Sequence, residues 1–157
     1  MSVQKVNQLP LSIDLSDKRD VRTQFGALCY RTHKDKVEVL LISSRGTGRW
    51  VIPKGWPMEG KTPEDCAKIE AWEEAGAKGK ITGGCIGLYS YAKGMSSSDS
   101  LPCAVMVYPF KVKDMANDYP EADERDRKWM SSKKAAKKVD EPELAHILAH
   151  FDPANHT

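Results

Sequence analysis

The sequence lacks the features that define several broad classes of protein. It contains no apolar run approaching the ~18 residues of a membrane-spanning helix, and its first 20 residues contain no apolar core like that of a signal peptide. The net charge is only +2, which does not indicate bulk binding to nucleic acid. We therefore expect neither a membrane nor a nucleic-acid partner.

Cysteine is scarce as well. The chain has four cysteines: Cys29, Cys66, Cys85 and Cys103. They have neither the short spacings of a zinc site nor the density of a disulfide framework. The simplest interpretation is four reduced core residues, which favours a cytoplasmic protein.

Length and composition favour one globular domain. The chain has 157 residues, of which 40% are hydrophobic and 29% charged, enough for a core of ordinary size. It contains no internal repeat. We expect residues 1–20 to form a polar lead-in, residues 21–151 the domain, and residues 152–157 a short tail.

The most informative stretch runs from Trp50 to Ala77, with the sequence WVIPKGWPMEGKTPEDCAKIEAWEEAGA. Its pattern predicts a short strand, a glycine-bearing loop and a helix. Thr62 suits the N-cap of that helix and Pro63 its first position. Gly76 suits the left-handed residue just past its end.

Three carboxylates lie on one face of this predicted helix. Glu70, Glu73 and Glu74 stand at i, i+3 and i+4, within an arc of about 100°. At neutral pH they repel one another, and a divalent cation is the simplest partner for them. Such a triplet alone is more typical of a solvent-facing helix, but the loop and caps around it favour a metal site.

This stretch resembles a known family. The run from Gly55 to Gly76 resembles the signature box of the Nudix hydrolases, which hydrolyse a diphosphate linked to another moiety with Mg²⁺ or Mn²⁺. The flanking segments EVLLISSRGTGRWVIPKG and DRKWMS resemble the branch that cleaves diphosphoinositol polyphosphates and diadenosine polyphosphates. The likeness covers most of the chain, so it is more specific than a bare motif.

The resemblance implies roles for the acids. Glu70 and Glu74 would hold the metal, and Glu73, beside them, would deprotonate the attacking water. The catalytic residues implied are therefore Glu73 and Glu70, and all three glutamates are candidate metal ligands together with the Gly55 carbonyl. Other Nudix enzymes distribute these roles differently, so the choice of base stays open.

Basic residues near the box are candidates for contacting substrate phosphates. They are Arg45, Arg49, Lys54, Lys61 and Lys93. Further along, an acidic stretch over residues 114–124 precedes a basic one over residues 125–138. We interpret both stretches as solvated faces, with a basic wall facing a polyphosphate as the alternative.

The chain departs from the family pattern at two positions. Lys61 and Ile69 stand where the family has a glutamate and an arginine, which form an ion pair that supports the metal carboxylates. Both partners are replaced together, so neither leaves an unpaired buried charge. We interpret this as a changed support around an intact ligand set. The loss also motivates an alternative, a Nudix-shaped module that senses a nucleotide without cleaving it.

Apolar periodicity and turn residues predict the remaining elements. We expect strands over residues 24–31, 36–43, 80–91, 101–112 and 127–130, and helices over residues 131–139 and 141–151. Strands with helices between and after them fit a mixed sheet. The resemblance implies the α/β/α sandwich of the Nudix fold.

The sequence therefore favours a Mg²⁺-dependent hydrolase that cuts a phosphoanhydride bond by water attack. Its expected substrates are dinucleoside polyphosphates or diphosphoinositol polyphosphates. A pyrophosphatase for ADP-ribose or nucleotide sugars is the enzymatic alternative. Nothing in the sequence indicates an oligomeric state.

Overall fold

The computed structural model describes residues 7–11, 21–93 and 101–155, so most of the expected lead-in lies outside the described residues. The strands are β1 (Arg22–His33), β2 (Lys36–Ser43), β3 (Trp50–Val51), β4 (Lys54–Gly55), β5 (Ala77–Ile81), β6 (Gly87–Lys93), β7 (Leu101–Met115) and β8 (Arg127–Ser131). The helices are α1 (Pro63–Ala75), α2 (Ser132–Lys138) and α3 (Pro142–Ala149), followed by a 3₁₀ turn over Pro153–Asn155.

Strand β1 lies at the centre of a mixed sheet. It runs antiparallel to β2 and β4 and parallel to β7. Strands β3 and β8 pair with β2, and β5 and β6 pair with β7, all in antiparallel fashion. The sheet therefore contains both kinds of pairing, as expected from the resemblance.

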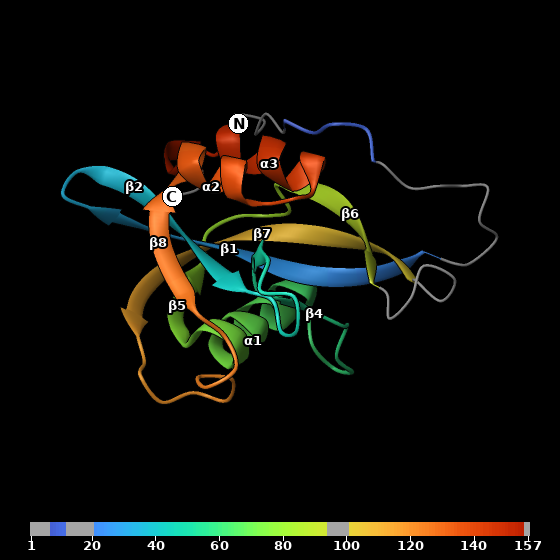
Figure 1. Cartoon of the computed structure of the whole chain (residues 1–157), viewed down its shortest axis with the longest axis horizontal. Coiled ribbons are helices and arrows are strands. Elements are labelled where there is room, and N and C mark those ends of the chain that lie inside the picture. The colour runs from blue at the N-terminus through green and yellow to red at the C-terminus, as the bar shows by residue number, and fades with distance from the viewer. Residues whose placement is uncertain (1–6, 12–20, 94–100, 156–157) are drawn as a thin grey trace.

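Helices cover both faces of this sheet. Figure 1 shows α1 on one side and α2 with α3 on the other, so the three layers are helix, sheet and helix. The expected α/β/α sandwich is confirmed. None of the helices in the described part of the chain is long and apolar enough to cross a bilayer.

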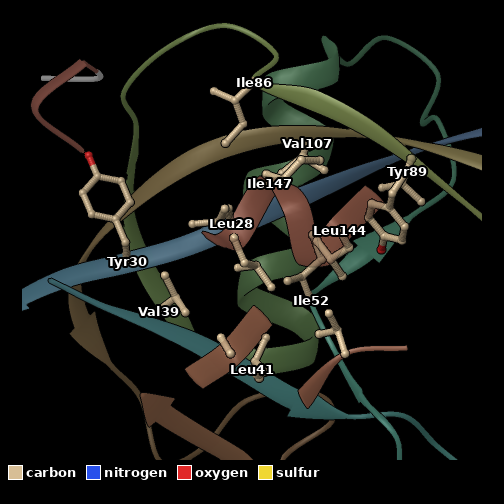
Figure 2. Packing of buried hydrophobic residues seen from close by; sticks show 14 of the residues in the cluster. Leu28, Tyr30, Val39, Leu41, Ile52, Ile86, Tyr89, Val107, Leu144 and Ile147 are labelled. Atoms are coloured by element: carbon tan, nitrogen blue, oxygen red, sulfur yellow. The ribbon is translucent and has the colours of Figure 1, made fainter. Parts of the chain in front are cut away.

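Two cores result because successive strand residues point to opposite faces. On β1, Leu28 and Tyr30 belong to the core beneath α2 and α3, whereas Ala27 and Cys29 belong to the core over α1. Figure 2 shows the first of these cores, in which strand residues pack against Leu144 and Ile147 of α3.

The single strand expected over residues 80–91 is wrong. The chain forms two strands there, β5 and β6, which pair with successive parts of β7. Between them, the Thr82 amide donates to the Pro109 carbonyl at 3.0 Å and the Ile86 amide donates to the Val107 carbonyl at 2.8 Å. Pro109 has no amide hydrogen to return, so the antiparallel ladder is interrupted beside it.

Candidate functional site

Helix α1 has the boundaries that its sequence predicts. The Thr62 hydroxyl accepts a hydrogen bond from the Asp65 amide at 3.1 Å, and Pro63 occupies the first turn. Gly76 ends the helix with φ at 65°, and its amide donates to the Trp72 carbonyl at 2.9 Å. A side chain at Gly76 would be strained at this φ. These caps fix the rotation of the helix and therefore the direction of its acids.

The apolar face of α1 consists of small residues. Ala67, Ala71 and Ala75 are fully buried against the sheet, with no side-chain bulk to hold the helix away. Glu70 and Glu74 lie beside this contact and are themselves only 8% and 6% exposed. The close packing therefore carries two carboxylates into the interior.

The backbone of β4 lies directly over those carboxylates. The Ala27 amide donates to the Pro53 carbonyl at 2.9 Å and anchors the segment to β1. The Lys54 amide is directed at Oε1 of Glu74 at 3.4 Å. A Cβ added to Gly55 would overlap the Glu70 carboxyl group, so only glycine fits here.

The two buried carboxyl groups are strongly perturbed. Burial, together with the hydrogen bond to Glu74 and the charge of that group, raises the pKa of Glu70 to about 9. Burial also raises the pKa of Glu74, against the opposing effects of the Glu70 hydrogen bond and of the Arg125 and Lys54 charges. Without a further cation, the pair therefore holds a proton at neutral pH.

A third carboxylate reaches the pair from the loop between β7 and β8. This loop satisfies carbonyls at the end of α1: the Ala116 amide bonds to Gly76 at 2.8 Å, and the Glu121 amide bonds to Glu73 at 3.0 Å. The Arg127 guanidinium bonds to the Ala75 carbonyl at 2.9 Å. Docking of the loop brings Glu121 close to the two helix carboxylates. The charge of Glu121 contributes to raising the pKa of both Glu70 and Glu74.

These groups open into a cleft of about 470 Å³. Its acidic lining consists of Glu70, Glu74 and Glu121, and its basic lining consists of Arg45, Arg49, Lys54, Lys93 and Arg125. Gly55, Gln24, Ser44, Thr47, Trp56, Tyr91 and Ala92 complete the wall. A site with several cations around a small group of carboxylates suits an anionic ligand that brings a metal ion with it.

The cleft brings together most of the residues expected from the sequence. Four of the five candidate phosphate contacts line it, and Lys61 does not, because it lies exposed at the turn before α1. Glu70, Glu74 and Gly55 also line it. Glu73 is half-buried on the same helix, but it is not among the residues of the described chain that line the cleft.

The basic side chains of the cleft already have protein contacts. Arg45 lies 3.6 Å from Glu121 and 3.4 Å from Glu124. Arg49 lies 3.1 Å from Glu141 at the start of α3. The two lysines stand over rings: the Lys54 Nζ is 5.0 Å from the centre of the Tyr91 ring and the Lys93 Nζ is 4.9 Å from that of the Trp56 ring. Burial lowers the pKa of Lys54, against the opposing charges of Glu74 and Glu141.

Sequence reasoning missed Glu121 and Arg125 as members of the site. Both lie in charged stretches that we interpret as solvated faces, and the alternative of a basic wall facing a polyphosphate includes Arg125 but not Glu121. Only the docking of their loop against α1 brings them to the cleft.

The donor set fits a hard divalent cation. Within the described ranges, no three His, Cys, Asp or Glu side chains form a ready-made metal-binding group. The buried pair of Glu70 and Glu74, with Glu121 nearby, nevertheless places carboxylate oxygens close together, and burial raises the pKa of both helix carboxyls. Carboxylate oxygens are the ligands that Mg²⁺ and Mn²⁺ prefer, and Glu121 could complete the set.

Comparison with known proteins shows which family the chain resembles. Residues 21–151 match the NUDIX domain family. Over 108 residues the chain is 32% identical to Nudix hydrolase 13, mitochondrial, of Arabidopsis thaliana, covering 65% of this chain and 53% of that protein. Over 123 residues it is 27% identical to diphosphoinositol polyphosphate phosphohydrolase 3-beta of Homo sapiens, covering 77% and 71%.

A solved structure shares the fold. The Ap4A hydrolase of C. elegans superposes with a TM-score of 0.58 at 20% identity, covering 83% of this chain and 95% of that one. The chain spans about half the length of the two Arabidopsis thaliana relatives that it matches, 53% and 51%. With the family match extending over most of the sequence, the chain belongs to the NUDIX domain family.

Proposed function

We propose that this chain is a Mg²⁺- or Mn²⁺-dependent hydrolase of a phosphoanhydride bond, in dinucleoside polyphosphates or diphosphoinositol polyphosphates. The observation that carries the proposal is the buried pair of Glu70 and Glu74 at the floor of a cleft with basic walls. Polyphosphates need both features, since their oxygens require positive partners and their hydrolysis requires a base and a metal site.

The metal would be held by Glu70 and Glu74, with Glu121, Glu73 and the Gly55 carbonyl as further candidates. Bound there, it would neutralise phosphate charge and lower the pKa of water. Of the two glutamates implicated as catalytic, Glu70 is supported by its position in the cleft lining, while Glu73 lies one turn away from that position.

In the proposed reaction, water attacks a phosphorus atom of the anhydride. The new bond joins the water oxygen to that phosphorus atom. The bond between the same phosphorus and the bridging oxygen breaks, and the bridging oxygen leaves with the phosphate group on its other side. Glu70 or Glu73 takes the proton from the water. Lys54, Lys93, Arg45 and Arg49 would bind phosphate oxygens, and the two arginines would exchange their present carboxylate partners for the substrate.

The non-phosphate half of the substrate has a candidate partner in Trp56. This side chain lines the cleft and is 38% exposed, which is high for a tryptophan. A nucleobase can stack on such a ring, whereas an inositol ring has no flat π-face to offer. This feature favours a dinucleoside polyphosphate within the proposed pair of substrate classes. A cytoplasmic setting stays part of the proposal, supported by four unpaired cysteines.

A panel of diphosphate compounds tests the proposal. Diadenosine tetraphosphate, a diphosphoinositol polyphosphate, ADP-ribose and a nucleotide sugar would be incubated with the protein, with Mg²⁺ and with EDTA, and the products separated by ion exchange. We expect Mg²⁺-dependent cleavage of one of the first two. Preferential cleavage of ADP-ribose or the sugar would support the pyrophosphatase alternative, and binding without cleavage would support a sensing module.

A further inference from the structure

Arg125 has an unusual set of contacts for an arginine at the edge of a cleft. Its side chain is only 10% exposed. Its Nε lies 3.0 Å from Oε1 of Glu121, its Nη2 lies 3.7 Å from Oε1 of Glu74, and its Nη1 donates to the Ser43 carbonyl at 3.2 Å. Each nitrogen of the guanidinium group therefore faces an oxygen of the protein.

These contacts join carboxylates that come from two separate elements. Glu74 belongs to α1, and Glu121 belongs to the loop between β7 and β8. Both carboxylates contact the same guanidinium group, so they lie close enough together to repel each other. A fixed cation between them offsets this repulsion, and its hydrogen bond from Nε fixes the direction of the Glu121 side chain beside Glu74.

Besides the hydrogen bond that Glu74 shares with Glu70, the other contacts of Glu74 and Glu121 are long or exposed. The Lys54 amide reaches Glu74 only at 3.4 Å. Lys61 is exposed at its turn and Ile69 has an apolar side chain, so neither can orient a carboxylate in the cleft. Arg45 also approaches Glu121, but it is 59% exposed and lies 3.6 Å away. At Glu121, Arg125 is closer and less exposed than Arg45. At Glu74, it adds a full positive charge 3.7 Å from the carboxylate that the Lys54 amide reaches at 3.4 Å.

We propose that Arg125 is a positioning residue, which aligns Glu121 with Glu74 so that both face the cleft as one acidic site. The inference rests on the proposed metal-dependent hydrolysis and deepens it. Arg125 acts through the carboxylates, and its own nitrogens are occupied by protein oxygens. A direct phosphate contact is the competing role, and the two roles differ in what a substitution changes.

The first measurement is metal binding in the absence of substrate. Mn²⁺ would be titrated into the wild-type protein and into Arg125→Gln, with free Mn²⁺ followed by electron paramagnetic resonance. We expect the substitution to weaken Mn²⁺ binding roughly 10–100-fold, the usual effect of removing a group that orients metal ligands. Tighter binding in the variant would overturn the proposal, because Arg125 would then act only as a charge that repels the metal.

The second measurement separates geometry from charge. Arg125→Lys keeps the charge but cannot contact two carboxylates with a rigid fork. We expect its Mn²⁺ affinity to fall nearly as far as that of the glutamine variant, and its kcat to fall while its KM changes less than about threefold. Wild-type affinity in the lysine variant, or a rise in KM at constant kcat, would overturn the proposal.

Further variants distinguish a local effect on the site from a general loss of fold. Glu121→Gln removes the carboxylate partner of Arg125 and leaves the arginine in place. The double variant, Glu121→Gln with Arg125→Gln, should bind Mn²⁺ no more weakly than the weaker-binding of the two single variants. Additive losses would contradict the proposal. Arg31→Gln is the matched control: its ion pair with Glu38 at 2.9 Å lies outside the cleft, and its Mn²⁺ affinity should be unchanged. If the Arg125 variants bound Mn²⁺ and turned over substrate as well as the wild-type protein does, only this inference would fail. If the wild-type protein itself neither bound Mn²⁺ nor turned over substrate, the proposed function would fail as well.

Discussion

The carboxyl groups of Glu70 and Glu74 share a hydrogen bond beneath the Lys54–Gly55 backbone. They stand four residues apart on α1, which makes them neighbours on the helix surface. Both are buried, so both resist ionisation unless a cation compensates. The chemistry that the cleft can perform depends mainly on this pair.

Glu70→Gln should lower kcat by roughly 10²–10⁴, the usual range for removing a general base. The substitution preserves size and one acceptor oxygen, so the thermal unfolding midpoint should stay the same or rise. Steady-state kinetics on the preferred diphosphate, with calorimetry of unfolding, would measure both quantities.

Glu73→Gln is the matched comparison on the same helix. Its side chain does not contribute to the described lining of the cleft, so we expect a loss of about 10–100-fold, the usual effect of losing a group that supports metal ligands. A larger loss at Glu73 than at Glu70 would assign the base to Glu73.

Metal-free protein should become less stable as the pH rises. The pKa of Glu70 is raised from 4.5 to about 9 in the folded state, so the folded protein binds this proton more tightly than the unfolded chain does. The resulting stabilisation is complete below a pH of about 4.5 and is lost as the pH rises through about 9. We expect the thermal midpoint in EDTA to fall across this window.

Two controls separate this effect from general titration. Glu70→Gln has no proton to lose at this site, so its midpoint should depend less on pH over the same window. Saturating Mg²⁺ should raise the wild-type midpoint most at the alkaline end, where the carboxylates are free to bind it. An identical pH profile for the wild type and the variant would contradict the assignment.

Trp56→Leu should discriminate between the two proposed substrate classes. Stacking of a base on an aromatic side chain contributes about 1–3 kcal/mol, so KM for diadenosine tetraphosphate should rise about tenfold or more. KM for a diphosphoinositol polyphosphate should stay the same, and Trp56→Tyr should retain most of the affinity. Equal effects on both substrates would mean that Trp56 only supports its loop.

Much of the fold could be predicted because it depends on local signals. Caps at Thr62 and Gly76 define α1, and the period-2 alternation along β1 assigns its residues to two cores. The same helix register predicts that Glu70 and Glu74 face one way. These features depend on residues that are close together in the sequence, so they can be recognised in a single sequence.

The features that were missed depend on contacts between distant segments. The break between β5 and β6 lies opposite Pro109, some 25 residues further along the chain, and no local pattern predicts that pairing. Likewise, Glu121 and Arg125 join the site only because their loop bonds to the carbonyls at the end of α1. A charged residue on a loop looks the same in sequence whether it faces solvent or a catalytic cleft.

Restoring the ion pair typical of the family, with Lys61→Glu and Ile69→Arg together, should leave turnover equal or raise it up to about tenfold. The introduced arginine would support the helix carboxylates from a side that nothing charged now supports, since Lys61 is exposed and Ile69 is apolar. In an Arg125→Gln background, the same pair should recover part of the lost Mn²⁺ affinity, because orientation lost on one side is regained on the other. Ile69→Arg alone is the control, and it should be worse than the pair because its charge would lack the glutamate partner that the family pattern supplies. A collapse of activity in the double variant would show that Lys61 and Ile69 have their own function in this chain, and that the support of the acidic site was never transferred to Arg125.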